Sequence, residues 1–345
     1  MSVRHRFILF KAFGMLLLVF VLTIVGCESE EAEPNHWTAL EVPDFGTLVD
    51  AQFINSNTGI ILGQNREGTN IIIKTNDGGI TWNKIDLLEE TPEGNLRKIR
   101  LNPFSPNEIY TGNQNIYKST NGGELWEQLG EFPCPENIIF FDALNGITAD
   151  FRIRKSNDSG QTWRLVTENI NAYPDLSQFT SNRIGYIAGG VDAHGWSIGG
   201  MAKTLDGGLS WTPVDYGFSR VTGMCFVDDN TGYITTYVTE GENLANLMTG
   251  YSLLVTTDGG TTWNTVENKI KEKYGEFARV SFFKNLNEGF LSTNLGIYKT
   301  SNGGHQWTKE LNGFYQTYFT SDGTGFAIDR ESGEVFKRTL PEVMP

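Results

Sequence analysis

The chain is poor in the residues that build thiol and metal sites. Its 345 residues include three cysteines, and the four histidines are scattered at His5, His36, His194 and His305. No cluster of these residue types has the spacing of metal ligands, so we expect no metal site. Cys134 and Cys225 could pair or stay free, and a large packed core would not need their disulfide.

Basic residues are scarce relative to acidic ones. Lys and Arg number 27 against 41 Asp and Glu, which gives a net charge of -14. A surface of this sign repels phosphate backbones, which argues against nucleic acid as a partner. No glycine-rich loop of the dinucleotide-binding type follows a predicted strand, so we expect no cofactor.

The N-terminal region predicts an export signal. Residues 13–25 are almost entirely apolar and follow a basic region with Arg4, Arg6 and Lys11. This order is typical of a secretory signal, and the apolar run is too short for a comfortable transmembrane helix. The run ends in Ile24-Val25-Gly26-Cys27, which resembles the lipobox of bacterial lipoproteins. That resemblance implies that residues 1–26 are removed and Cys27 is lipidated; the alternative is an uncleaved anchor helix.

Residues 27–35 predict the lipidated cysteine and an acidic tether. Residues 28–35 lack large apolar side chains, and eight residues reach at most about 28 Å. An acidic run behind a lipidated cysteine also resembles surface-export signals of some Gram-negative lipoproteins. We therefore expect an exported protein that is lipid-anchored in the cell envelope, at the outer membrane, with surface exposure left open.

One motif recurs six times and predicts the fold. Each copy has Asp or Asn, then one or two glycines, and a tryptophan five positions after the Asp or Asn. The copies begin 37 to 52 residues apart, which suits one four-stranded propeller blade per copy. These are Asp-boxes, formed by Asp77 and Trp82, Asn121 and Trp126, Asp158 and Trp163, Asp206 and Trp211, Asp258 and Trp263, and Asn302 and Trp307.

The Asp-box predicts a turn between the third and fourth strands of a blade. Asp or Asn bonds the backbone of the turn, the glycines supply positive φ, and the tryptophan packs from the next strand. Six repeated carboxylates could instead bind metal or substrate. Asn121 and Asn302 occupy the same place without a charge, so a structural role is the better interpretation.

A second pattern gives the number of blades. Between boxes, an apolar strand is followed by a turn that ends in glycine and then by another strand, as around Gly232 and Gly289. A seventh unit over residues 314–338 has three strands and no fourth. Trp37, in strand 36–42, has no box before it, so this strand should complete the last blade and close the ring. We predict an all-β, seven-bladed β-propeller over residues 36–345.

The sequence of the repeat resembles that of a known family. Thr231-Gly232-Tyr233, the sequence from Asn287 to Phe290, and the sequence from Tyr298 to Trp307 are similar to the photosystem II assembly and stability factor family. The resemblance covers about residues 36–340. It implies an exported, membrane-associated, chaperone-like binder that helps to assemble membrane protein complexes. We expect the propeller to be monomeric. Nothing in the chain points to a photosystem, so we expect a non-photosynthetic protein partner in the envelope.

An enzyme is the alternative, most sharply a sialidase. Phe151-Arg152-Ile153-Arg154 is similar to the Phe-Arg-Ile-Pro motif of that family, but the proline is absent. The segment also joins directly to the third Asp-box and should be a third strand. No pair of carboxylates is singled out by spacing, so no catalytic residue is assigned. A carbohydrate-binding or carbohydrate-degrading surface lipoprotein, with a glycan as partner, stays the second hypothesis.

Two features suggest where a partner binds. Insertions at 189–200 and 239–250 fall on the face opposite the Asp-boxes, and they supply the candidate contact residues His194, Trp196, Leu244, Leu247 and Met248. Trp196 is the one tryptophan that the repeat does not explain, and it could equally pack over its own loop. Predicted first strands also place basic residues near the central channel, where they could form a patch or pair with acids: Arg97, Arg100 and Arg279.

Overall fold

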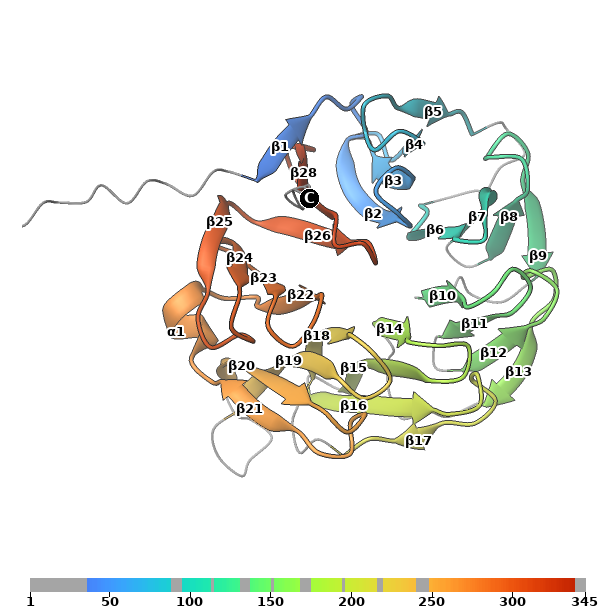
Figure 1. Cartoon of the computed structure of the whole chain (residues 1–345). Helices are drawn as coiled ribbons and strands as arrows, with labels where there is room; N and C mark the ends of the chain where they lie inside the picture. The colour runs from blue at the N-terminus through green and yellow to red at the C-terminus, as the bar shows by residue number, and fades with distance from the viewer. Residues whose placement is uncertain are drawn as a thin grey trace, which may run out of the picture. The chain divides into compact units, whose positions relative to one another are not determined.

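The computed structural model describes residues 36–87, 95–112, 115–130, 137–149, 152–167, 175–193, 196–215, 220–239 and 248–338. These residues form seven four-stranded antiparallel sheets, arranged as blades around a central opening (Figure 1). The predicted fold class, an all-β seven-bladed propeller, is confirmed. In each blade the first strand lies nearest the centre and the fourth lies at the rim (Figure 1).

The first four blades follow one another along the chain. Blade one contains β2 (Thr47–Phe53), β3 (Gly59–Gln64), β4 (Asn70–Thr75) and β5 (Asn83–Ile85). Blade two contains β6 (Lys98–Asn102), β7 (Ser105–Gly112), β8 (Ile116–Ser119) and β9 (Glu127–Gly130). Blade three contains β10 (Asn137–Phe140), β11 (Gly146–Ala149), β12 (Ile153–Ser156) and β13 (Arg164–Thr167). Blade four contains β14 (Leu176–Phe179), β15 (Gly185–Ala193), β16 (Trp196–Thr204) and β17 (Thr212–Pro213).

The last three blades complete the ring. Blade five contains β18 (Val221–Phe226), β19 (Gly232–Thr239), β20 (Met248–Thr256) and β21 (Asn264–Glu267). The short helix α1 (Ile270–Tyr274) leads to blade six, which contains β22 (Arg279–Phe283), β23 (Gly289–Thr293), β24 (Gly296–Thr300) and β25 (Thr308–Asn312). Blade seven contains β26 (Tyr315–Phe319), β27 (Gly325–Asp329), β28 (Val335–Arg338) and β1 (Trp37–Leu40).

The N-terminal strand closes the ring as predicted. β1 pairs antiparallel with β28, with Trp37 opposite Arg338. Glu310, in β25 of the neighbouring blade, binds both strands: its Oε2 accepts hydrogen bonds from Trp37 Nε1 at 3.1 Å and from Arg338 Nε at 2.7 Å. Arg338 is fully buried and also lies over the ring of Phe290, 4.7 Å from its centroid. The closure therefore combines a sheet ladder with a buried ion pair.

Aromatic residues repeat at corresponding positions of the blades. The tryptophan of a box meets the last phenylalanine of the first strand edge-on, as Trp263 meets Phe226 at 6.2 Å between ring centroids. Trp37 makes the same contact with Phe319 in blade seven, at 6.3 Å. Such edge-to-face pairs contribute about 0.5–1.5 kcal/mol beyond their burial. The contact recurs in most blades, but not in blade two, where the first strand ends in Asn102.

Adjacent blades are joined by stacked rings. Tyr186 of blade four stacks on Phe226 of blade five, with centroids 3.5 Å apart, and Tyr233 of blade five stacks on Phe283 of blade six at 3.6 Å. The repeated glycine before these tyrosines leaves room for the packed rings, because a Cβ on Gly232 would lie 2.5 Å from the Phe226 ring. The core of the described residues accordingly consists of seven apolar clusters, each between two neighbouring blades.

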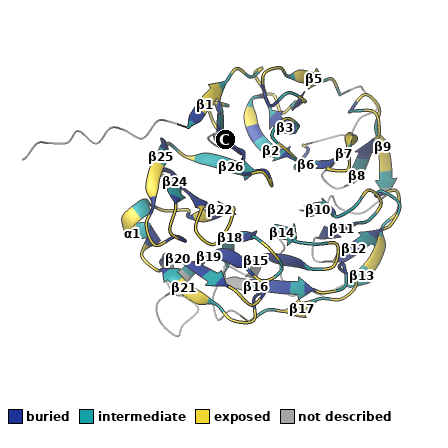
Figure 2. Cartoon of the chain, in the orientation of Figure 1, coloured by how far each residue is buried: buried dark blue, intermediate teal, exposed yellow. Residues whose placement is uncertain are grey.

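Burial follows the position of each strand in its blade. Figure 2 shows buried residues concentrated in the middle strands and exposed residues along the rim. All five residues of β23 are buried, whereas β5 has none. In the described part of the chain, no helix is long and apolar enough to cross a membrane.

The two faces of the ring differ in what they carry. Each box donates a backbone hydrogen bond to the turn between the first two strands of its own blade or, in blade two, to Asn107 near the start of β7; examples are Gly78 N to Asn57 O and Gly259 N to Asn230 O, both at 2.7 Å. These turns and the boxes define the Asp-box face. The first strands begin on the other side of the ring, which we call the opposite face.

The insertion at 189–200 is a longer hairpin. β15 and β16 continue pairing beyond the usual blade length, from Gly189 opposite Gly200 to Ala193 opposite Trp196. β19 and β20 are lengthened in the same way, up to Thr239 opposite Met248. Both hairpins extend on the opposite face, because they join second to third strands.

Candidate functional site

The Asp-box side chains bond within their own turns. Asp77 Oδ1 accepts a hydrogen bond from Thr81 N at 2.9 Å. The Thr81 side chain also bonds this carboxylate, and together these bonds lower the pKa of Asp77 to about 2. The uncharged Asn121 uses its Oδ1 in the same way, accepting from Leu125 N at 3.0 Å. The Asp and Asn side chains of the boxes thus serve to form the turn.

Lysines that precede the boxes bridge neighbouring blades, a role that the sequence analysis missed. Lys203 Nζ donates to Gly259 O in the box of the next blade, at 2.8 Å, and lies over the Tyr186 ring. Equivalent bonds run from Lys118 to Ser159 O at 2.6 Å and from Lys155 to Gly207 O at 2.9 Å. The signal was present in the repeat, because lysine stands three residues before the Asp or Asn in every box except that of Asp258.

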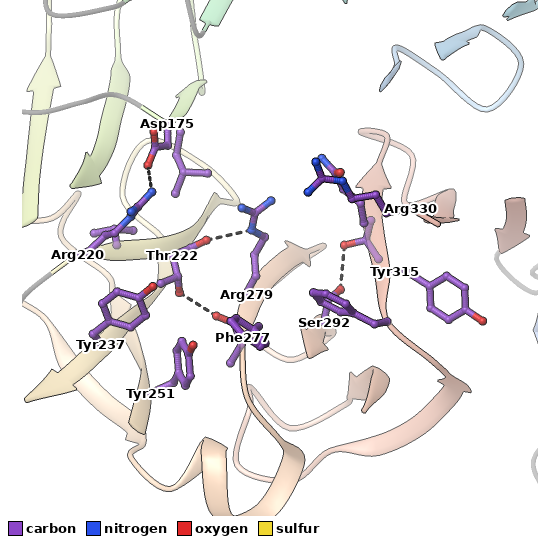
Figure 3. A pocket seen from close by; sticks show the side chains of 16 residues that line it. Asp175, Arg220, Thr222, Tyr237, Tyr251, Phe277, Arg279, Ser292, Tyr315 and Arg330 are labelled. Atoms are coloured by element: carbon purple, nitrogen blue, oxygen red, sulfur yellow. Dashed lines mark hydrogen bonds and ion pairs between the residues drawn. The ribbon is translucent and has the colours of Figure 1, made fainter. Parts of the chain in front are cut away.

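A pocket of about 380 Å³ opens on the opposite face. Figure 3 shows its lining, which comes from the beginnings of first strands in blades four to seven, from blade-five hairpin strands, and from the second strands of blades six and seven or their ends, which supply Ser292 and Arg330. Arg220 precedes β18, Arg279 begins β22 and Arg330 follows β27, so three guanidinium groups line one pocket. Side chains at the starts of first strands converge here because the blades narrow toward the ring axis.

The three arginines differ in their partners. Arg220 forms an ion pair with Asp175. Arg279 donates from Nε to Thr222 O at 3.0 Å (Figure 3). Among the described residues, no carboxylate forms an ion pair with Arg279 or with the exposed Arg330. Neither of these two guanidinium groups therefore forms an ion pair with a described carboxylate, and Asp175 acts on Arg279 only at longer range.

The surroundings of Arg279 increase its attraction for an anion. Its side chain is exposed toward the pocket; partial desolvation lowers its pKa, and the nearby Asp175 acts in the opposite direction. A guanidinium stays protonated at neutral pH even so. A charge that has lost hydration without gaining a carboxylate binds an incoming carboxylate more strongly than a fully solvated arginine does.

A second cavity, of about 670 Å³, adjoins the pocket in the central channel. The two share Asp175, Arg220 and Arg279 in their linings. Here Arg100 forms an ion pair with the buried Asp50, which also accepts a hydrogen bond from Ile99 N at 2.9 Å. Arg100 is thus neutralised, whereas Arg279 is not.

The three predicted basic residues therefore differ in where they lie. Arg100 and Arg279 both line the channel, as the sequence analysis placed them. Arg97 precedes β6 instead of lying on it, is exposed, and lines neither cavity. The sequence analysis missed Arg220 and Arg330, because each lies just outside a strand. Only an alignment of the repeats with one another could have placed them near the central channel.

The other predicted site residues are only partly described. His194, Leu244, Leu247, Cys27 and Cys134 lie outside the described residues. The backbones of Trp196 and Met248 begin β16 and β20, but their contacts lie outside what the structure describes. Their role in partner binding stays a prediction. Cys225 is a free, buried cysteine, and its Sγ accepts a hydrogen bond from Phe283 N at 3.1 Å.

Comparisons with curated proteins and family models indicate one family. The model described as photosynthesis system II assembly factor YCF48 matches residues 29–188. The photosystem II assembly lipoprotein Ycf48 of Synechococcus sp. (strain CC9902) is 28% identical over 189 residues, which cover 51% of this chain and 54% of that protein. The photosystem II assembly protein Ycf48 of Thermosynechococcus vestitus is 23% identical over 337 residues, covering 92% of this chain and 89% of that protein. The predicted resemblance to the Ycf48 family is confirmed.

Solved Ycf48 structures share the propeller fold. The structure "YCF48 bound to D1 peptide" superposes with a TM-score of 0.64 at 19% identity, covering 89% of this chain and 96% of that chain. YCF48 from Cyanidioschyzon merolae gives a TM-score of 0.61 at 17% identity, covering 88% and 98%. A GH74 enzyme from Niastella koreensis gives 0.55 at 15% identity, covering 84% and 65%. At these identities the structural likeness shows the fold alone.

Proposed function

We propose that this chain is a scaffold that binds an acidic segment of a partner protein and assists assembly of a membrane protein complex. The observation that carries the proposal is the pair Arg279 and Arg330, which line one pocket without a carboxylate partner among the described residues. The Ycf48 relatives are named as assembly factors, and one solved relative is titled as bound to a peptide. The proposed partner is a non-photosynthetic membrane protein of the cell envelope.

We also propose that the protein is exported and anchored through a lipid on Cys27, at the outer membrane. The basic and apolar regions before the lipobox support export, and the Synechococcus relative is named a lipoprotein. Replacement Cys27→Ser should release the protein from the membrane fraction in cell fractionation. Retention of the variant in membranes would instead favour an uncleaved anchor helix.

The arginine pocket and the channel cavity give no support to the carbohydrate-active alternative. A glycosidase needs two carboxylates free to act as acid and as base or nucleophile. The two carboxylates that line these cavities, Asp50 and Asp175, are each paired with an arginine. A scaffold that binds carboxylates uses the unpaired arginines directly, so the binding function is preferred.

Crosslinking in native membranes tests the scaffold. A photo-crosslinkable residue on the opposite face should trap one partner in wild type, identified by mass spectrometry. The double variant Arg279→Ala, Arg330→Ala should lose most of this product, while Arg183→Ala on the Asp-box face should keep it. Addition of salt should reduce the product, because exposed charges are screened beyond about 8–10 Å at physiological ionic strength. Equal products from the double variant and wild type would refute the proposal.

A further inference from the structure

Two exposed phenylalanines flank the arginine pocket. Phe277 is 59% exposed and Phe314 is 57% exposed, although both line the pocket. Their ring centroids are 5.9 Å apart with planes tilted by 31°. They come from different blades, because Phe277 precedes β22 and Phe314 precedes β26. Adjacent exposed aromatics beside a pocket are a feature of interaction sites.

The backbone of Phe277 is held in an unusual conformation. Its φ is 57°, a left-handed value that bulky residues rarely adopt. The next residue is fixed, because Ala278 O accepts a hydrogen bond from Thr222 Oγ1 at 2.8 Å (Figure 3). The buried Tyr251 lines the same pocket as Phe277. Strain of this kind persists only where the surroundings impose it, and it is concentrated at binding sites.

We propose that Phe277 and Phe314 form a hydrophobic subsite, the aromatic clamp, for a large apolar side chain of the acidic segment. The inference rests on the proposed function and adds which two types of residue the bound segment of the partner contains. One pocket supplies the clamp together with Arg279 and Arg330. The bound segment therefore has an acidic side chain and, close to it, a residue such as leucine or phenylalanine.

The size of the pocket limits the spacing of these two partner residues. A space of 380 Å³ is about 9 Å across if it is roughly spherical, and an extended chain rises about 3.3 Å per residue. We therefore expect the acidic and apolar residues to lie within about two positions of each other.

The carboxylate belongs to a side chain within the segment. Arg279 and Arg330 lie across the open space from each other, on blades six and seven (Figure 3). Both phenylalanines stand at the exposed edge, at the beginnings of neighbouring first strands. A segment that crosses the face between the two blades can contact the clamp and both arginines without entering the channel by its end.

Binding of blocked peptides to the full chain in detergent tests the proposal. The probes are nonapeptides of glycine and serine with acetylated and amidated ends, one glutamate, and leucine or serine two positions away. Fluorescence anisotropy should show about tenfold tighter binding of the leucine peptide by wild type, because leucine adds apolar burial. Moving leucine six positions from glutamate should remove this advantage.

Matched variants separate the clamp from the arginines. In Phe277→Asn, Phe314→Ser the leucine and serine peptides should bind equally, and asparagine tolerates the positive φ. In Phe104→Ser, which changes a 53% exposed phenylalanine on the Asp-box face, the tenfold advantage should remain. Arg279→Ala should weaken the binding of both peptides by the same factor.

The outcomes distinguish the two proposals. If both peptides bind wild type equally and Arg279→Ala weakens them, the clamp is wrong and the proposed function stands. If no blocked peptide binds but a peptide with a free terminal carboxylate does, the partner is a chain end and the inference is overturned. If no peptide binds in an Arg279-dependent way, both proposals fail.

Discussion

Replacement of Glu310 by alanine leaves the ring closure with a buried, uncompensated charge. Glu310 binds Arg338 through both carboxylate oxygens, at 2.7 Å and 3.0 Å, and the Arg338 side chain is 0% exposed. Removal of one partner from a buried ion pair costs about 3–5 kcal/mol. The same substitution removes the hydrogen bond to Trp37, so β1 loses a contact that connects it to blade six.

The predicted loss can be read from thermal unfolding. An unfolding entropy of about 2.1 cal/mol/K per residue gives about 0.6 kcal/mol/K for a domain of about 300 residues, so the melting temperature should fall by about 5–8 °C. Differential scanning calorimetry of the full chain measures this shift. The control is Asp86→Ala, which breaks a 4.0 Å ion pair between side chains 59% and 82% exposed and should change stability little.

A double variant isolates the charge. Glu310→Leu with Arg338→Met removes both charges and keeps apolar volume, so it should recover most of the stability that Glu310→Ala loses. A melting temperature for Glu310→Ala within 1 °C of wild type would refute the reasoning. It would mean that the β1–β28 ladder alone closes the ring.

Further predictions concern the blades and their turns. Lys203→Met should destabilise the protein by about 1.5–3 kcal/mol, measured by urea unfolding, because Gly259 O loses a charged donor. Val255→Lys should raise the urea midpoint, because the new side chain could reach the box of blade six as Lys203 reaches that of blade five; an unchanged midpoint would contradict this. The pKa of Asp77 is lowered to about 2, below an ordinary value near 3.9. The stabilisation of the folded state by the ionised carboxylate is therefore complete above about pH 4 and is lost as the pH falls through 2. Asp77→Asn should therefore keep the urea midpoint at neutral pH and reduce the decrease of this midpoint between pH 4 and 2. A decrease as large as that of wild type would mean that other groups cause the acid sensitivity.

Repeated local chemistry made the fold predictable. The Asp-boxes and the glycines of the first turns specify their own turns, so their spacing gave the blades directly. Trp37 without a preceding box predicted the closing strand, and β1 pairs with β28 as expected. The insertion at 189–200 was recognised, but its continuation of the β15–β16 ladder was not, because pairing depends on both strands.

The candidate site was harder than the fold to predict from the sequence. Arg100 and Arg279 are both basic residues of first strands, and no local pattern distinguishes them. They differ because Asp50, far away in sequence, neutralises one and no described carboxylate pairs with the other. The exposure and positive φ of Phe277 likewise depend on contacts from another blade and have no signature in the residues around it.

The sequence by itself determined the repeat, the seven blades and the strand that completes the last one, because turns and alternating strands are encoded within a few residues. Tertiary structure decided which charges are neutralised and which remain open. Ion pairs such as Arg100 with Asp50 and Glu310 with Arg338 join different strands and blades, and their formation depends on distances that only the closed ring sets. For the same reason, the pocket that holds Arg279, Arg330 and the aromatic clamp exists only once blades five, six and seven stand side by side.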